Sequence, residues 1–291
     1  MPEYPDIIVY IEALERYALG RELREVRVTT PFLVRTYAPP IDVLRGQTLT
    51  SLRRVGKRIA FGFSGGEWMV LHLMIAGRLH WNGKRLALAS FEFDNGTLTL
   101  TEAGSRRQAS VHVFSGWEGV AGIDPGGLEV MDCGFEEFAA RFTAANHTLK
   151  RALTDPRILA GIGNAYSDEI LHWAGLSPVA LSQKLTAEEL GRLLAAIRDR
   201  LLYFTAVLRG QGEFPEKVTA FREEMAVHGK FGKPCPRCMT AIQRIVHGAH
   251  ETNYCPACQT GGKLLADRAL SRLLGKDWPK TIEEMENRKK G

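Results

Sequence analysis

The chain has 291 residues, of which 45% are hydrophobic and 24% are charged. These values are ordinary for a globular protein, and the length suffices for two domains with buried cores. There is no apolar run as long as a membrane span, and the N-terminus lacks the basic start and apolar stretch of a secretion signal. We therefore expect a cytoplasmic protein without a membrane partner. The net charge of +5 suits a polyanionic partner without requiring one.

The first part of the chain changes from a helical to a strand pattern. Apolar residues at every third or fourth position over residues 7–18 predict a helix that ends near Gly20. From about 26 to 114 the period becomes two, which indicates antiparallel strands. Asn95-Gly96 between alternating apolar residues predicts a hairpin. The turn residues at 124–127, Asp-Pro-Gly-Gly, predict a domain linker.

The second part of the chain has a helical pattern. Thr186-Ala187-Glu188-Glu189 is a capping box that opens a long helix, and Gly210 and Gly212 end it. The last segment, Lys263–Gly291, has helical character around 264–274. Its apolar content favours a packed helix and turn over a docking surface for a partner.

Four of the five cysteines form two closely spaced pairs. Cys235 and Cys238 are separated by sixteen residues from Cys255 and Cys258. Two such pairs can close a tetrahedron of thiolates around one Zn²⁺ with a hairpin between them, and a chance pairing or redox dithiol fits this double spacing less well. Four protein ligands leave no open coordination position, so we predict a structural zinc and no organic cofactor. Cys133 is expected to be a small buried residue rather than a nucleophile.

Four segments carry a family resemblance. They are Met1–Asp6, Gly56-Lys57, Leu159–Leu171 and Phe221–Cys235, the last of which runs into the cysteine cluster. Together they resemble the formamidopyrimidine-DNA glycosylase/endonuclease VIII family over about residues 1–260. The resemblance implies an α+β multidomain fold. Its parts would be an N-terminal helix plus antiparallel β-sandwich (1–127), a helix–two-turn–helix domain (128–224), a Cys₄ zinc-finger hairpin (225–262) and a C-terminal extension (263–291).

The resemblance also implies the reaction, base excision from DNA followed by cleavage of the strand at the abasic site. Removal of Met1 leaves a secondary amine on Pro2. An α-amine titrates near ~8, so a neutral fraction exists at pH 7 that can attack C1′ and form an iminium, which permits β/δ-elimination. Glu3 would act as general acid and base, although a helix N-terminal charge is the plainer interpretation. Lys57 would contact the phosphate beside the lesion, although it also fits a solvated edge residue.

The resemblance assigns further residues to DNA binding. Lys150 and Asn164 match phosphate contacts of the family. Gly161 and Gly163 allow a tight turn, and the helix that follows presents backbone N–H groups to an anion. We expect a monomer that binds damaged DNA, single- or double-stranded, and that is associated with the nucleoid if the source is bacterial.

The finger departs from the family pattern at one position. His250 stands where the family has an arginine that holds phosphate at the lesion. Arginine is permanently charged and bidentate, whereas histidine is only partly charged at pH 7. We therefore expect weaker phosphate binding, or compensation by Arg244 or His247.

The lesion-probing segments depart from the pattern as well. Relatives that excise oxidised purines have His-Leu-Gly-Met-Ser-Gly where this chain reads His72–Gly77, which places Ile75 at the methionine and leaves Met74 as a candidate substitute. Their Arg-Arg-Phe wedge corresponds to Arg106-Arg107-Gln108 here, so the aromatic wedge is missing. Since these side chains fill the gap left by a flipped base, we expect weaker gap filling in duplex DNA.

The identity of the excised base stays open. The segment between Arg209 and Phe221 is shorter than the Thr-rich loop that covers 8-oxoguanine in relatives, so we do not expect 8-oxoguanine as the main substrate. The candidate substrates that remain are an oxidised pyrimidine, a ring-opened purine, a bulky adduct and single-stranded DNA. The departures also leave a non-catalytic DNA-damage binding protein as the alternative, which the presence of Pro2 and Glu3 disfavours. A zinc ribbon of the transcription type fits the segments around Pro2 and Gly161 poorly.

Overall fold

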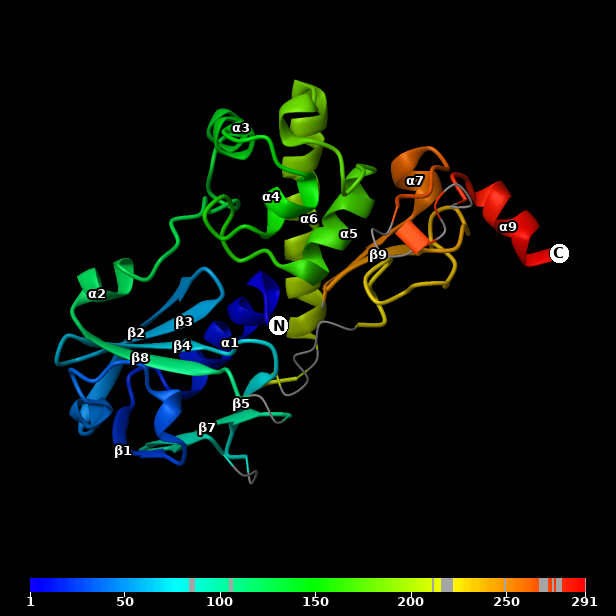
Figure 1. Cartoon of the computed structure of the whole chain (residues 1–291). Helices are drawn as coiled ribbons and strands as arrows, with labels where there is room; N and C mark the ends of the chain where they lie inside the picture. The colour runs from blue at the N-terminus through cyan, green and yellow to red at the C-terminus, as the bar shows by residue number, and fades with distance from the viewer. Residues whose placement is uncertain are drawn as a thin grey trace. The chain divides into compact units, whose positions relative to one another are not determined.

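The computed structural model describes residues 1–83, 87–104, 107–210, 212–215, 222–248, 250–266, 272–273, 275 and 279–290 (Figure 1). The chain divides into two compact units. Unit 1 comprises Met1–Gly127 and Leu202–Ala220, and unit 2 comprises Leu128–Leu201 and Phe221–Gly291. The first boundary follows the predicted linker, while the finer division into four domains stays a prediction. Within the described ranges, no helix has the length and apolar character needed to cross a membrane.

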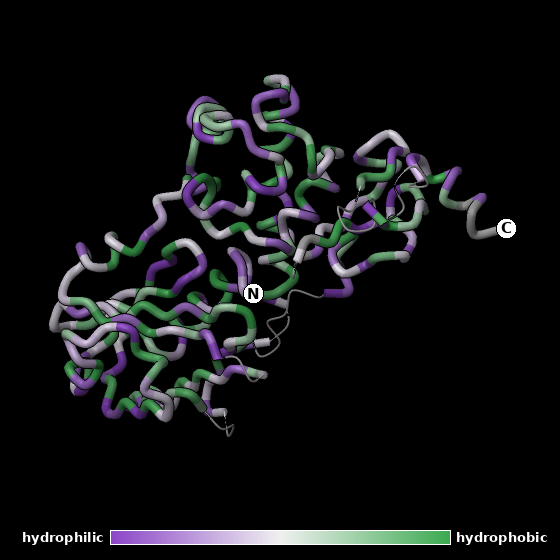
Figure 2. Tube along the Cα trace, viewed as in Figure 1, coloured by the Kyte–Doolittle hydropathy of each residue, from purple (hydrophilic) through white to green (hydrophobic). Residues whose placement is uncertain are grey.

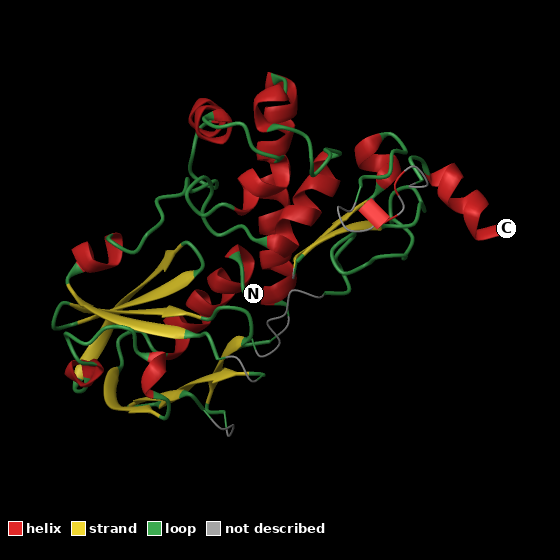
Figure 3. Cartoon of the chain, viewed as in Figure 1, coloured by secondary structure: helices red, strands yellow, loops and turns green. Residues whose placement is uncertain are grey.

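Unit 1 is built on one antiparallel sheet. Its elements are α1 (Tyr4–Tyr17), β1 (Glu22–Val28), η1 (Pro31–Leu33), η2 (Ile41–Leu44), β2 (Gln47–Val55), β3 (Arg58–Phe63), β4 (Glu67–His72), β5 (Gly77–Trp81), β6 (Ala89–Phe93), β7 (Gly96–Glu102), β8 (Ser110–Ser115) and α2 (Trp117–Ala121). The strand order is β5-β7-β6-β1-β2-β3-β4-β8. β1 and β2 share only two registered pairs, and the two halves of the sheet beside this junction lie as two layers (Figure 3).

The core of unit 1 lies between these layers and α1. Tyr10 of α1, Phe61 of β3 and Phe91 of β6 belong to one cluster of fully buried side chains. Hydrophobic residues accordingly follow the strands of unit 1 in Figure 2. Full burial of one such side chain contributes roughly 1.5–3 kcal/mol, so α1 and both layers stabilise one another. The predicted helix and antiparallel sandwich are confirmed.

The predicted hairpin at Asn95-Gly96 is confirmed with its turn one residue earlier. Phe93 of β6 pairs with Gly96 of β7, so Asp94 and Asn95 form the turn. Gly96 is the first residue of the strand β7. A Cβ at this position would approach the Trp81 ring to 2.7 Å. The glycine therefore makes room for the indole rather than for the turn.

Unit 2 contains mainly helices and a two-stranded hairpin. Its described elements are α3 (Phe135–Thr143), α4 (Leu149–Thr154), α5 (Asn164–Ala174), η3 (Ser182–Lys184), α6 (Ala187–Arg209), β9 (Gln243–His247), β10 (His250–Tyr254), α7 (Pro256–Thr260) and α9 (Ile282–Lys290). The last eight residues of α6, Leu202–Arg209, are assigned to unit 1. The Leu159–Leu171 segment is expected to form a helix, a glycine turn and a second helix. The turn and the second helix, α5, are confirmed, but the first helix is wrong, because residues 159–163 are not helical and α4 already ends at Thr154.

The long helix α6 begins and ends as predicted. The backbone N–H of Glu189 donates to Oγ1 of Thr186 at 3.2 Å, and the N–H of Thr186 donates to Oε2 of Glu189 at 2.9 Å. These bonds satisfy donors that a helix start leaves without partners. The helix ends at Arg209, directly before Gly210.

The C-terminal extension carries a helix that the apolar pattern did not predict. Most of the helix expected around 264–274 lies outside the described residues. Helix α9 starts instead after Thr281, whose Oγ1 accepts from the N–H of Glu284 at 3.2 Å, while Oε2 of Glu284 accepts from Lys280 N at 2.7 Å. Thr281-x-x-Glu284 is a capping-box pattern, and it was the sequence signal available for this helix.

Candidate functional site

The amino terminus of unit 1 lies in a buried, charged environment. Both Pro2 and Glu3 are buried. Burial lowers the pKa of the terminal amino group, which Met1 carries, below its ordinary value; Glu3 and Asp6 raise it, and Arg78 and Lys57 lower it further. A lowered pKa enlarges the neutral fraction of an amine at pH 7, and only the neutral amine is a nucleophile. Sequence reasoning missed Arg78, which follows directly on the predicted probing segment.

Glu3 has a structural role beside the amine. Its backbone N–H donates to Oδ2 of Asp6 at 2.8 Å, and its side chain accepts from the backbone of Asp6 in return. This reciprocal cap explains why α1 begins at Tyr4, before the apolar periodicity becomes visible. The Glu3 carboxylate thus serves as a helix cap and lies within electrostatic range of the amino group.

Lys57 occupies the tip of the β2–β3 hairpin. Val55 pairs with Arg58, so the loop contains only Gly56 and Lys57. Gly56 has φ +59°, which the tight turns of two-residue hairpins require and glycine adopts without a steric cost. The turn places Lys57 close enough to the amino terminus to affect its pKa.

The predicted probing segment forms a tight turn between β4 and β5. The N–H of Gly77 donates to the carbonyl of Leu73 at 2.9 Å, and a Cβ at Gly77 would lie 2.3 Å from that oxygen. Met74, at the position of a glycine in the related segment, has φ +52°. Ile75 is 62% exposed at the turn, and Arg78 Nη1 donates to the Gly77 carbonyl at 2.6 Å.

The predicted wedge segment is tied down by a carboxylate. The N–H of Gln108 lies 2.9 Å from each carboxylate oxygen of Glu102, and the N–H of Ala109 donates to Oε2 at 3.1 Å. Exposed Arg107 reaches Oγ1 of Thr30 at 3.4 Å. Arg106 lies outside the described residues. Glu102, which sequence reasoning did not single out, holds the backbone here.

The glycine turn of unit 2 meets the finger hairpin. Gly161 has φ +82°, Gly163 precedes α5, and Asn164 is the first residue of the helix. Asn164 Nδ2 donates to the carbonyl of Glu251 on β10 at 3.0 Å. The predicted phosphate-binding residue is thereby linked to the finger.

Asp168 is the centre of a buried polar network in unit 2. Its side chain is completely buried, and its Oδ1 lies 2.5 Å from Nζ of Lys150. Its Oδ2 accepts from the N–H of Asn253 at 3.1 Å and lies 2.8 Å from Nδ1 of His228. Lys150 Nζ also donates to the Asn164 carbonyl at 2.7 Å. Lys150 and Asn164 are therefore brought together as predicted, but the lysine is half of a buried ion pair.

Glu169 connects α5 to the segment that enters the finger. Its carboxylate accepts backbone N–H bonds from Ala226 at 2.8 Å and from Val227 and His228 at 2.9 Å. Burial raises the pKa of Glu169, and these three bonds oppose the increase. The carboxylate holds residues 226–228 against the helix.

The four paired cysteines form a metal site. Their sulfur atoms all lie within 4.8 Å of one another. Cys235 and Cys258 Sγ are 3.9 Å apart, and Cys238 Sγ lies 3.4 Å from Sγ of Cys255. Tetrahedral Zn²⁺ with Zn–S bonds of about 2.3 Å places sulfurs about 3.8 Å apart. The donor set therefore fits one structural zinc, with β9 and β10 as the predicted hairpin between the pairs.

Helix α5 packs against this metal site. His172 Nε2 lies 3.2 Å from Cys235 Sγ. Burial lowers the pKa of His172 to about 4, with smaller contributions from Arg237 and Arg200, so the ring is neutral at pH 7. Arg237, between the first two cysteines, donates to the carbonyls of His172 and Trp173 at 3.0 and 3.3 Å. A cation at a helix C-terminus is favourable, and this one joins finger and helix.

The residues predicted to replace the finger arginine lie on the hairpin. His250 pairs with His247 across β9 and β10, but both side chains lie outside the described part. Arg244 Nη1 forms an ion pair with Oε2 of Glu251 at 3.0 Å, and its Cζ lies 4.3 Å from the centre of the Phe231 ring. Arg244 is 45% exposed, so its guanidinium is both engaged and accessible.

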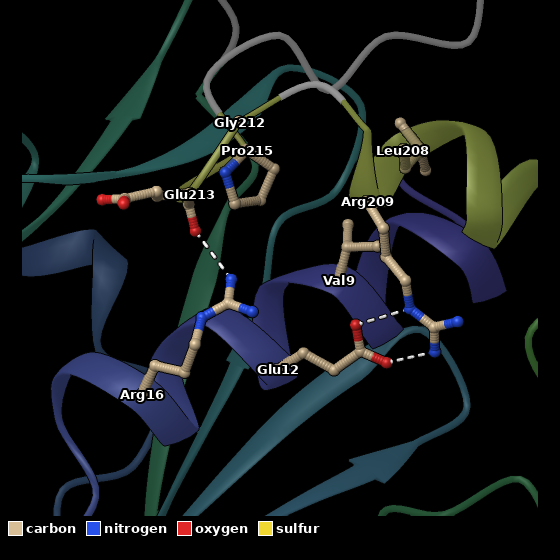
Figure 4. Close-up of a pocket in the computed structure, with 8 residues that line it drawn as sticks. All are labelled: Val9, Glu12, Arg16, Leu208, Arg209, Gly212, Glu213 and Pro215. Carbon is tan, nitrogen blue, oxygen red and sulfur yellow. Dashed lines mark hydrogen bonds and ion pairs between the residues drawn. The ribbon is translucent and has the colours of Figure 1, made fainter.

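The segment after α6 is anchored on α1 within unit 1 (Figure 4). Arg209 Nε donates to Oε2 of Glu12 at 2.9 Å. Arg16 Nη2 donates to the carbonyl of Glu213 at 2.8 Å. Tyr17 Oη donates to the carboxylate of Glu213 at 2.7 Å. The next residue, Phe214, packs against the core of the unit. Residues 212–215 are thus held against α1.

Comparison with known proteins gives one consistent result. The formamidopyrimidine-DNA glycosylase N-terminal domain matches residues 1–111, the H2TH domain of the same proteins matches 122–213, and a zinc finger found in FPG and IleRS matches 232–261. A formamidopyrimidine-DNA glycosylase of Ligilactobacillus salivarius is 30% identical over 277 residues, covering 89% of this chain and 99% of the relative.

Two further proteins are similar. An uncharacterized formamidopyrimidine-DNA glycosylase-like protein of Mycobacterium tuberculosis is 39% identical over 148 residues, 51% of this chain and 93% of the relative. The crystal structure of the MutM (Fpg) protein from Thermus thermophilus superposes with a TM-score of 0.77 at 28% identity, covering 89% of this chain and 98% of the other.

Proposed function

The chain belongs to the formamidopyrimidine-DNA glycosylase family, and we propose that it excises a damaged base from DNA and cleaves the abasic strand through Pro2. The observation that supports this proposal is the environment of the amino terminus: burial lowers the pKa of the amine that Met1 carries, against Glu3 and Asp6, and Arg78 and Lys57 lower it further. Pro2 is proposed to inherit this environment once Met1 is removed. The non-catalytic alternative is not favoured, because binding alone has no use for a buried terminal amine whose pKa is lowered.

The proposed reaction begins once Met1 is removed. The Pro2 nitrogen attacks C1′ as the bond from C1′ to the base breaks, and the base leaves with a proton. Glu3 protonates the ring oxygen, which opens the sugar and leaves an iminium between Pro2 and C1′. The iminium acidifies the proton on C2′. A proton acceptor can then remove this proton while the bond to the 3′ phosphate breaks. Elimination at the 5′ phosphate and hydrolysis then release the enzyme.

Lys57 and Arg78 assist by charge. Both are positive groups near the amine, so they disfavour its protonation. Lys57, at the tip of a hairpin, is proposed to contact the phosphate beside the lesion.

Asn164 and the N-terminus of α5 are proposed to hold a phosphate. Lys150 orients Asn164 by donating to the Asn164 carbonyl, and it also donates to Asp168. The third N–H group of the Lys150 ammonium is proposed to bind DNA.

Zinc supports the same function from the finger. The bound ion holds the two cysteine turns together, and a closed set of four thiolates leaves no place for substrate on the metal. The finger then presents β9, β10 and Arg244 to DNA. We place the protein in the cytoplasm, where chromosomal DNA is accessible if the source is bacterial, and we propose that it acts as a monomer.

The base that leaves is proposed to be other than 8-oxoguanine. Residues 212–215 are held on α1 by Glu213 and Phe214. The rest of the segment between Arg209 and Phe221 is then proposed to be too short to cover 8-oxoguanine. Ile75 and Met74 are proposed to enter the gap left by the flipped base, with Arg107 beside them. An oxidised pyrimidine or a ring-opened purine is the substrate class that we propose.

The decisive experiment is borohydride trapping on abasic DNA. The processed enzyme should form a covalent product with DNA, and Pro2→Gly should form much less of it, because its primary amine gives an ordinary imine in place of the permanently charged iminium of the secondary amine. Absence of trapping by the parent at every pH would leave only the binding function. A panel of oxidised pyrimidines, ring-opened purines and 8-oxoguanine, each in single- and double-stranded oligonucleotides, then identifies the base.

A further inference from the structure

One face of the sheet in unit 1 carries rows of residues that the site above does not use. Directly paired residues on β3, β4 and β8 form the rows Arg58–His72–Ser110, Ala60–Val70–His112 and Gly62–Trp68–Phe114. Paired residues share a face, as do residues two apart on a strand. Neighbours such as Ile59 and Leu71 belong to the main core. Arg58, His72 and His112 therefore share the opposite face.

The loop before β2 adds a fourth basic residue, Arg35, to this face. The N–H of Arg35 donates to the carbonyl of Val111 at 2.8 Å, and the N–H of Val113 donates to Oγ1 of Thr36 at 2.8 Å. These two bonds hold the loop along β8 on either side of His112. Arg35 is exposed and acts electrostatically on His112.

The cluster of Arg35, Arg58 and His112 has an excess of positive charge. Burial lowers the pKa of His112, and Arg58 and Arg35 lower it further. Burial, Arg58, Lys57 and His112 lower the pKa of His72 to about 4. Among the residues that the structure describes, Asp124 is the acidic group that raises the pKa of Arg58, against the larger effect of burial.

A polar atom in the cluster also lacks a partner. His112 Nδ1 is buried and has no hydrogen bond to any residue that the structure describes. Its ring stacks on Phe114, with 6.0 Å between centres and 6° between planes, which fixes its orientation. The two guanidinium groups of Arg35 and Arg58 against the one carboxylate of Asp124, together with this imidazole, form a surface suited to an anion.

Exposed aromatic rings beside Arg35 point to a nucleic acid as the source of that anion. Phe32 is 79% exposed and Tyr37 is 97% exposed on the loop that carries Arg35. Aromatic side chains that alternate with basic ones are typical of surfaces that bind unpaired nucleotides, because the rings stack on bases while the cations contact phosphates.

The cluster is also continuous with the proposed reaction site. Lys57 affects the pKa of the amino terminus and that of His72, and His72 is paired with Arg58. We propose that Arg35, Arg58 and His112 bind a backbone phosphate of the DNA strand beyond the one at Lys57, and that Tyr37 stacks on an unpaired base of that strand. This inference rests on the proposed function and extends its substrate to single-stranded or partly unpaired DNA.

The test measures binding of the processed full chain to oligonucleotides that contain a tetrahydrofuran abasic-site analogue, single-stranded and duplex, over a series of KCl concentrations. Arg58→Gln and Arg35→Gln should each weaken binding. Because both arginines are assigned to one phosphate, each single variant should make the slope of log K against log[KCl] shallower. The double variant should make it shallower by about 0.7 for the single strand and about 0.9 for the duplex, which is the contribution of one phosphate. Arg58→Lys, which keeps the charge, should restore most of the slope. Arg24→Gln, at an exposed position of β1, is the matched control and should match the parent.

The base contact is tested separately. Tyr37→Ala should lose affinity for the single strand by about tenfold, while Tyr37→Phe, which keeps the ring, should not. Slopes for Arg58→Gln and Arg35→Gln equal to that of the parent would overturn the phosphate contact, and equal affinities of the two Tyr37 variants would overturn the stacking. A parent that neither binds nor is trapped on abasic DNA would instead refute the proposed function, which distinguishes the two failures.

Discussion

Nζ of Lys150 lies 2.5 Å from Oδ1 of Asp168, whose side chain is completely buried. The same carboxylate accepts from Asn253 on the finger hairpin, and the same ammonium donates to the carbonyl of Asn164. The pair therefore connects the glycine turn, α5 and β10. A lysine that the family resemblance makes a phosphate contact has an additional structural role in this protein.

Breaking this pair should cost stability as well as DNA affinity. In Asp168→Asn, Lys150 would remain buried without a counter-charge, and the loss of one partner of such a pair costs about 3–5 kcal/mol. Urea unfolding of the variant measures this cost. The control is Glu188→Gln, because the side chains of Glu188 and its partner Arg192 are 88% and 45% exposed and surface pairs contribute little. An equal effect of the two substitutions would contradict a structural role for Asp168.

The trapping reaction should depend on pH through the amino terminus. Burial, Arg78 and Lys57 lower the pKa of the amine that Met1 carries, and the Pro2 amine is expected to lie in the same environment after Met1 is removed. The rate should therefore rise with pH and reach its plateau at lower pH than for an amine without these neighbours. Arg78→Gln removes a positive charge that disfavours the protonated amine, so its midpoint should move to higher pH. Arg78→Lys should keep the parent midpoint. The measurement is the rate of borohydride trapping across pH 5.5–9, and superimposable profiles for Arg78→Gln and the parent would rule out this role.

Stability should fall in weak acid through His72. Its pKa is about 4 in the folded protein against an ordinary value of 6.5, so the unfolded chain binds a proton in this range that the folded chain does not. Its contribution is fully present above pH 6.5, decreases as the pH falls towards 4 and changes no further below that. Thermal unfolding at pH 7, 5.5 and 4.5 should show a smaller decrease for His72→Asn than for the parent. An identical decrease in both would show that other groups cause it.

Removal of zinc should unfold the finger and abolish tight DNA binding. Ligand binding to a site absent from the unfolded chain is coupled to folding, and in the described part of the finger the fully buried apolar residues clustered with the cysteines are Val227 and Ile242. Cys255→Ser should reduce the zinc content below one ion per chain and lower DNA affinity. Cys133→Ser removes a buried cysteine outside the cluster and should retain one zinc and full binding. Full zinc content in Cys255→Ser would exclude the four-cysteine site.

The anchor after α6 should affect lesion preference more than strand cleavage. Glu213→Ala removes the hydrogen bond from Tyr17 and frees one end of the segment that follows α6. We expect its relative rates on different damaged bases to change while trapping on abasic DNA stays within about twofold, since an abasic site has no base to cover. The lesion panel measures both. Unchanged base preferences would separate this segment from lesion recognition.

The sequence by itself determined the features that depend on spacing along the chain. The cysteine pairs predicted the metal site, Thr186 and Glu189 predicted the start of α6, and the Asn95-Gly96 signal predicted a hairpin. These features form from residues a few positions apart, so local geometry specifies them. The family resemblance added the role of Pro2, which no composition or periodicity reveals.

Only the tertiary structure decided the relationships between distant segments. Asp168 is an unremarkable residue of a helix until Lys150 and Asn253 are placed against it. Arg58 and His112 lie more than fifty residues apart in the sequence and share a face only because β3, β4 and β8 pair in one register. Ion pairing, burial and charge crowding depend on distances through space, and these follow from the packing of the whole unit rather than from any local pattern.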